Sequence, residues 1–145
     1  MKSGAGFTII EIVLAMGILA LIFGVGAPLL ADAYRDIALR TEHKRFVNLL
    51  RRAERYAFSN HAASSYGLRI LDDSFVFFRG SSYADRNAAF DEIYARSDTI
   101  LFSGPSEIVF FAPTGLPSGA ASWDLFQGDT EIASVVLNEY GRITW

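Results

Sequence analysis

The sequence predicts an α+β protein in which one long N-terminal helix packs on an antiparallel β-sheet. Three observations lead to this prediction. Residues 12–31 form an uncharged apolar run, residues 37–57 carry apolar side chains at helical spacing, and short β-prone runs alternate with turn residues after Ser64. The chain has 145 residues and is 51% hydrophobic, with the apolar excess near its N-terminus. We therefore expect one globular domain with an apolar N-terminal appendage.

The apolar run at residues 12–31 contains twenty residues and is long enough to cross a membrane. As a helix it spans roughly 30 Å, the thickness of a bilayer core. Lys2 precedes the run, on the side that tends to stay in the cytoplasm. The residues after the run are therefore expected to be exported.

One acidic side chain, Glu11, stands at the start of this apolar segment. An ionised carboxylate within a membrane is unfavourable by about 2.5–3.5 kcal/mol or more. Nothing basic lies within one helical turn of Glu11. We therefore expect its partner to come from another chain.

The stretch from Gly6 to Glu11, Gly-Phe-Thr-Ile-Ile-Glu followed by the apolar run, resembles the cleavage signal of type IV pilins and type II secretion pseudopilins. The resemblance implies that a prepilin peptidase cuts between Gly6 and Phe7, and that Phe7 is then N-methylated. Cleavage exposes an α-amine at Phe7, which is cationic near neutral pH. The resemblance implies that this amine pairs with Glu11 of a neighbouring subunit and fixes the register of assembly. The implied fold is pilin-like.

Two glycines and a proline, Gly24, Gly26 and Pro28, lie in the second half of the apolar run. Proline removes a helical hydrogen bond and glycine lowers helix propensity, so we expect a kinked or partly melted segment there. The resemblance implies that this segment unwinds in assembled filaments. The alternative is that glycine and proline are simply common in membrane helices.

Residues 32–60 predict an amphipathic helix that ends near Phe58, with Asn60 as a stop signal. Its apolar positions recur at three- and four-residue intervals and should lie against the sheet: Ile37, Phe46, Leu49, Leu50, Ala53, Tyr56 and Ala57. Basic side chains mostly occupy the other faces. We interpret them as a solvated surface with local ion pairs, with anionic lipid or acidic neighbours as the alternative partners.

Residues 61–145 predict a β-rich domain. Strands are expected at residues 66–71, 75–79, 99–102, 107–112, 132–137 and 142–145. The first two flank a hairpin turn at residues 72–74, and turns are also expected at residues 113–115 and 138–141. Residues 87–95 suit either a short helix or part of a long loop spanning residues 80–98.

Further segments resemble the H-type pseudopilin and FimT-like minor pilin group. They are Arg-Arg-Ala-Glu at residues 51–54, Tyr-Gly-Leu-Arg-Ile at 66–70, Ile-Val-Phe-Phe at 108–111 before Pro-Thr-Gly at 113–115, and Gly-Arg-Ile at 141–143. The resemblance implies a minor subunit of a secretion pseudopilus or a type IV pilus. The chain departs from major pilins and G-type pseudopilins, because it has no C-terminal cysteine pair and no compact acidic calcium loop.

The expected organisation is a leader peptide at residues 1–6, a transmembrane and filament-core helix at 7–31, an amphipathic helix at 32–60 and a periplasmic domain at 61–145. The resemblance places the protein in the bacterial inner membrane as a single-pass subunit, with its N-terminus cytoplasmic, before it enters a periplasmic filament. The implied partners are prepilin peptidase, other pilin or pseudopilin subunits, an inner-membrane assembly platform and membrane lipid.

Catalysis, cofactors and metals are not expected. The sequence has no nucleophile elbow, P-loop or HExxH motif, and His43 and His61 have no accompanying ligand motif. From residue 59 onward there are five Lys/Arg and eleven Asp/Glu, a net charge of −6 that disfavours nucleic acid.

Three alternatives stay open. The Gly6-Phe7 pair could occur by chance in a simple membrane anchor. A secretory signal peptide could be cleaved at the small-x-small site Ala31-Asp32-Ala33, although the apolar core of such signals is only about 7–15 residues long. The chain could also be a FimT-like DNA receptor for natural transformation, in which Arg142 would be the only basic residue near the C-terminus.

Overall fold

A computed structural model describes residues 8–145, without the side chains of residues 25–36. One α-helix, α1 (Ile9–Phe58), precedes all the strands. The chain divides into two compact units, Met1–Ala38 and Leu39–Trp145, and α1 contributes to both. The second unit contains the second half of α1 and all the strands.

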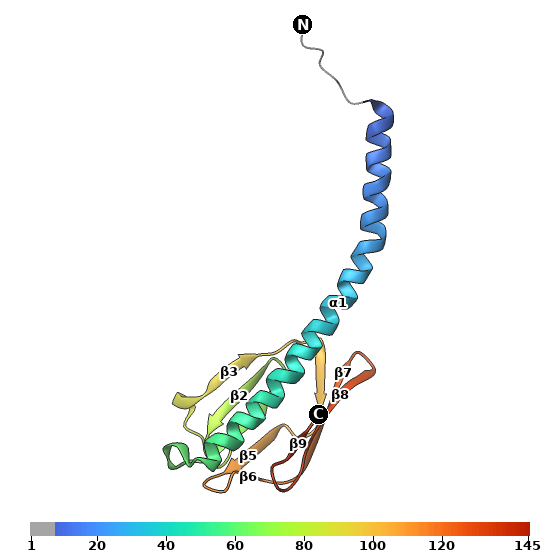
Figure 1. The fold of residues 1–145 in the computed structure, drawn as a ribbon. Helices are drawn as coiled ribbons and strands as arrows, with labels where there is room; N and C mark the ends of the chain where they lie inside the picture. The colour runs from blue at the N-terminus through green and yellow to red at the C-terminus, as the bar shows by residue number, and fades with distance from the viewer. Residues whose placement is uncertain (1–7) are drawn as a thin grey trace. The chain divides into compact units, whose positions relative to one another are not determined.

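Two antiparallel sheets form the second unit. Sheet A has the order β3-β2-β1-β5-β6, from β1 (Tyr66–Ile70), β2 (Ser74–Arg79), β3 (Glu92–Ala95), β5 (Glu107–Phe111) and β6 (Leu116–Pro117). Sheet B has the order β4-β7-β8-β9, from β4 (Ile100–Ser103), β7 (Ala121–Gln127), β8 (Thr130–Leu137) and β9 (Ile143–Thr144). Figure 1 shows the second half of α1 lying across these strands. The predicted α+β class, with a helix packed on antiparallel strands, is confirmed.

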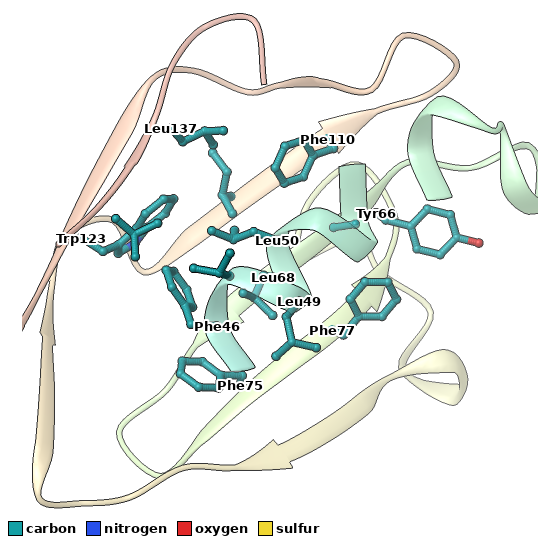
Figure 2. Close-up of a cluster of buried hydrophobic side chains, with 14 of the residues drawn as sticks. Phe46, Leu49, Leu50, Tyr66, Leu68, Phe75, Phe77, Phe110, Trp123 and Leu137 are labelled. Atoms are coloured by element: carbon teal, nitrogen blue, oxygen red, sulfur yellow. The ribbon is translucent and has the colours of Figure 1, made fainter. Parts of the chain in front are cut away.

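The predicted apolar face of α1 supplies the centre of the core. The buried apolar residues of this half of the helix are Phe46, Val47, Leu49, Leu50, Ala53 and Ala57. Figure 2 shows side chains from both sheets around them, including Phe75 and Phe77 of sheet A and Trp123 and Leu137 of sheet B. The prediction was wrong for Ile37, which is 63% exposed. It also missed Val47, while Tyr56 is only partly buried.

The helix ends where the sequence predicted. The last helical residue is Phe58, and Asn60 adopts a left-handed conformation with φ of 53°. Asparagine tolerates this conformation better than most residues, so it can end a helix and redirect the chain. The short 3₁₀ turn His61–Ala63 then leads into β1.

The hairpin between β1 and β2 is also confirmed. Ile70 pairs with Phe75, and the amide of Leu71 donates to the carbonyl of Ser74. Within β1, Gly67 faces Phe78 across the strand pair, and a Cβ at Gly67 would overlap the Phe78 ring. Glycine therefore lets this aromatic ring lie flat over the strand, where Phe78 is fully buried.

The segment between β2 and β3 differs from both predicted alternatives. It contains a 3₁₀ turn, η2 (Ala88–Phe90), and then the strand β3, whose edge position was not predicted. The ring of Tyr83 packs against Phe78, and the Tyr83 amide donates to the carboxylate of Glu107. Arg86 lies 3.6 Å above the Tyr83 ring and pairs with Asp91 at 2.7 Å. This segment is therefore an ordered cover over one face of sheet A.

A single arginine joins the two sheets. Arg96 donates to the carbonyl of Leu71, after β1, and to the carbonyl of Ile100 in β4, both at 2.6 Å. Its guanidinium also lies 4.7 Å from the centre of the Phe102 ring. The planar, multidentate guanidinium can satisfy both carbonyls at once, which the single ammonium of lysine does less well.

Candidate assembly helix and basic groove

The first half of α1 is apolar on every described side. Its large exposed side chains are Ile9, Ile10, Ile12, Val13, Leu14, Met16, Ile18, Leu19, Leu21, Ile22 and Phe23. A helix that is apolar all round is stable when lipid or other helices cover it. This segment is therefore the candidate assembly helix.

Glu11 lies in the first turn of this helix. Its amide donates to the carbonyl of Thr8 at 3.1 Å and to the Thr8 hydroxyl at 3.3 Å. Thr8 is thus the N-cap residue, and Thr-x-x-Glu is the sequence pattern of a capping box. A carboxylate in the first turn also interacts favourably with the helix dipole. Glu11, the candidate predicted from the sequence, therefore lies at the start of the helix and places one negative charge on an apolar surface.

The other predicted assembly residues are only partly covered by the structure. Gly6 and Phe7 lie outside the described residues. α1 continues without interruption through Gly24, Gly26 and Pro28, so no melted turn is present at these positions. Nothing lies within 4 Å of a Cβ built at Gly24, while the surroundings of Gly26 and the side chain of Pro28 belong to the undescribed part.

The structure offers no membrane span within its described residues, since no helix there has both the length and the apolar character required. The predicted span at residues 12–31 extends into residues 25–36, whose side chains lie outside the described part.

The two histidines, His43 and His61, lie in different surroundings. No group of three potential ligands occurs among the described residues. His61 packs against the rings of Tyr56 and Tyr66, with centroids 4.9 Å and 6.0 Å away. His43 is partly buried, and its Nε2 has no hydrogen-bond partner in the part of the chain described.

Burial of His43 lowers the pKa of its imidazole below the ordinary value of about 6.5. The unfolded chain therefore binds a proton at a higher pH than the folded chain does. The contribution of His43 to the free energy of unfolding should be fully present above about pH 6.5. It should be lost as the pH drops below that value, by at most about 1.4 kcal/mol per pH unit. His43→Leu should flatten this dependence in urea unfolding measured between pH 7 and pH 5. His61→Leu is the matched control, and the assignment is wrong if that variant flattens it instead.

A groove of about 590 Å³ lies between α1 and the edge strand β3. We call it the basic groove, and its lining residues are Thr41, Lys44, Arg45, Asn48, Leu49, Arg52, Arg55 and Tyr94. Four of these eight are cationic. The helical spacing of the sequence had placed these cations away from the apolar face, but it did not predict a concave surface.

Two of the cations tether β3 to the helix. Arg52 makes a bidentate pair with Glu92, with nitrogen–oxygen distances of 2.6 and 2.8 Å, and also donates to the hydroxyl of Tyr94. Arg45 pairs with Glu42 at 3.1 Å and donates to the carbonyl of Ala95 at 2.6 Å. The hydrogen bond from Arg52, followed by the one from Tyr94, lowers the pKa of the Glu92 carboxyl below its ordinary value.

The lengths of helix and strand explain why both ends of β3 are held. Arg45 and Arg52 are seven residues apart, roughly 10 Å along a helix. Glu92 and Ala95 are three residues apart, also roughly 10 Å along a strand. No local sequence pattern predicts this match, because the paired groups are 40 and 50 residues apart in the chain.

The Arg52–Glu92 pair should have a measurable coupling energy. We expect about 1 kcal/mol from a double-mutant cycle with Arg52→Met and Glu92→Gln, because the pair is bidentate but partly solvated. Urea unfolding gives the energies, and faster amide exchange in β3 would locate the effect. Arg55→Met is the control on the same groove and should change stability by less than about 0.5 kcal/mol. A coupling of zero would show that the Arg52–Glu92 pair does not help to hold β3.

No protein-family model, no curated protein and no solved structure matches the chain.

Proposed function

We propose that this chain is a minor pilin or pseudopilin subunit of a type IV pilus or a type II secretion pseudopilus, and that it assembles through α1. The observation that carries the proposal is the first half of α1, which is apolar on all described sides and has one carboxylate, Glu11, in its first turn. Such a helix needs lipid before assembly and neighbouring helices afterwards. Both environments favour a subunit that starts in a membrane and ends in a filament core.

The residues before the helix supply the partner for Glu11. Cleavage between Gly6 and Phe7 by a prepilin peptidase would create a cationic amine at the start of the apolar segment. Two opposite charges that are unfavourable alone in an apolar medium can neutralise each other when they pair. Pairing of the Phe7 amine with Glu11 of the next subunit would also fix the axial step between copies.

The second unit suits the part of such a subunit that lies outside the membrane. Its core is formed by residues from Leu39 onward, where the helix packs on two antiparallel sheets. This arrangement supports a pilin-like fold, in which one helix is both part of the globular core and the means of assembly. We place this unit in the periplasm, with residues 1–6 in the cytoplasm.

Leader removal tests the proposal directly. The full chain should be produced in a bacterium with and without a prepilin peptidase, purified from membranes, and studied by intact mass and N-terminal sequencing. We expect the mature protein to begin at Phe7 and to carry one added methyl group only when the peptidase is present. Gly6→Val should retain the six-residue leader that begins at Met1, because the resemblance places the cut directly after a glycine.

Two outcomes would overturn the proposal. A protein that still begins at Met1 in the presence of an active peptidase would have no free amine at Phe7. A protein that begins at Tyr34 would show that Ala31-Asp32-Ala33 is a secretory cleavage site and that the second unit is released.

A further inference from the structure

The basic groove contains two cations that form no salt bridge within the described residues, although the charge of Arg55 acts on the neighbouring Glu54 carboxylate. Arg45 and Arg52 pair with Glu42 and Glu92, as described above. Lys44 and Arg55 are exposed and form no ion pair in the part of the chain that the structure describes; Arg55 donates only to a backbone carbonyl of its own helix. They lie eleven residues apart, roughly 16 Å along the helix axis.

The hairpin of β7 and β8 has the opposite character. Its tip is the two-residue turn Gly128-Asp129, and Asp129 and Glu131 are exposed. Asp124 lies on β7 between the buried residues Trp123 and Leu125, so its side chain faces outward. None of the three carboxylates has an ion-pair partner among the described residues. We call this element the acidic hairpin.

The two surfaces are complementary in charge and similar in length. The helical segment 39–58 has six Lys/Arg and two Asp/Glu, a net charge of +4, whereas residues 59–145 have a net charge of −6. Asp124 on β7 and Asp129 in the turn lie about four strand positions apart along the hairpin, roughly 13 Å. This is a little less than the axial separation of Lys44 and Arg55. Within one copy the acidic hairpin belongs to sheet B and the groove borders the edge of sheet A, so the charges stay unpaired.

We infer that the basic groove of one copy receives the acidic hairpin of a second copy, with Lys44 and Arg55 paired to Asp124 and Asp129. Each copy then presents one groove and one hairpin, so the contact is heterologous and can continue from copy to copy. The inference deepens the proposed function and rests on it, because an open head-to-tail contact suits a subunit that assembles. It adds a contact between the second units that is independent of Glu11.

Cysteine cross-linking tests this contact, because the natural chain contains no cysteine. Asn48→Cys marks the groove, and Thr130→Cys on a chain with a larger tag marks the hairpin. The two full-length proteins are mixed in detergent micelles at low salt and oxidised. We expect about tenfold more mixed disulfide dimer than with Ala89→Cys in place of Thr130→Cys, because docking raises the local thiol concentration. High salt should remove this excess.

Charge-reversal variants provide the decisive experiment. Lys44→Glu with Arg55→Glu should abolish the excess, and adding Asp124→Lys with Asp129→Lys to the partner should restore it. Far-UV circular dichroism checks that each variant is folded. No excess over the Ala89→Cys control, or reversal without an effect, would overturn the inference. The inference would also be overturned if no mixed dimer formed and the protein bound duplex DNA tightly and in a salt-sensitive way, because the groove would then be a nucleic-acid site.

The outcome is separate from that of the proposed function. Cross-linking in micelles needs neither leader cleavage nor Glu11. If the mixed dimer is absent but the leader is removed normally after Gly6, only the groove–hairpin contact is wrong. If the leader is retained but a charge-dependent dimer forms, only the pilin proposal is wrong.

Discussion

Replacing Glu11 with alanine should abolish incorporation of this subunit into filaments while the protein still inserts into the membrane. The carboxylate is the single charge on the described apolar half of α1, and its proposed partner is the Phe7 amine of a neighbouring copy. Removing one member of a buried charge pair costs about 3–5 kcal/mol, because the other charge is left unpaired. At about 1.4 kcal/mol per tenfold change, association should weaken by roughly a hundredfold or more.

The measurement is the fraction of the subunit in sheared, sedimented filaments compared with the fraction in membranes. Glu11→Gln isolates the charge, because the amide has nearly the same size and shape. Thr8→Ala is the matched control for the helix start, since it removes the N-cap and should weaken the helix by only about 1 kcal/mol. If Thr8→Ala blocks assembly as strongly as Glu11→Gln, the carboxylate acts through helix capping, and the pairing role is wrong.

Replacing Phe46 with alanine should destabilise the second unit by about 3–5 kcal/mol. Phe46 is fully buried, and its ring lies 5.5 Å from that of Phe75, 5.1 Å from Phe102 and 5.1 Å from Trp123. These rings come from β2, β4 and β7, so one side chain of α1 contacts both sheets. Domains of this size have a total stability of about 5–15 kcal/mol, and the loss should be a large part of it.

Urea unfolding followed by tryptophan fluorescence measures this loss, because Trp123 packs against Phe46. Phe58→Ala is the matched control. Phe58 belongs to the same helix but is 70% exposed, so its replacement should change stability by less than about 0.5 kcal/mol. Equal effects of the two substitutions would mean that the buried ring cluster is not what holds the helix to the sheets.

The α+β class was predictable from sequence because the period of apolar residues changes from helical spacing to strand spacing near Ser64. The end of α1 at Phe58 and the hairpin of β1 and β2 were predictable for the same local reasons. The strand β7 was missed although its signal was present. Trp123 and Leu125 alternate with the polar residues Ser122 and Asp124, and Gly128-Asp129 is a two-residue hairpin turn with φ of 61° at the glycine.

The strand β3 could not be predicted in the same way. It is four residues long, and a large part of what holds it is tertiary, in the contacts of Arg45 and Arg52 with its two ends. The same limit applies to the basic groove, which exists only because a distant strand runs beside the helix. Glu11 was predictable as a candidate assembly residue, because a charged residue within an apolar run can be recognised from the sequence alone. Its role in assembly stays a prediction.

The tethered strand β3 also affects how readily the folded protein aggregates. An open sheet edge is a template on which another chain can add a strand, and repeated addition leads to aggregates. Here the edge strand is short, carries the charged Glu92, and has the carbonyl of Ala95 occupied by a helix arginine. These features disfavour strand addition at this edge, so the folded sheet is protected from uncontrolled growth there.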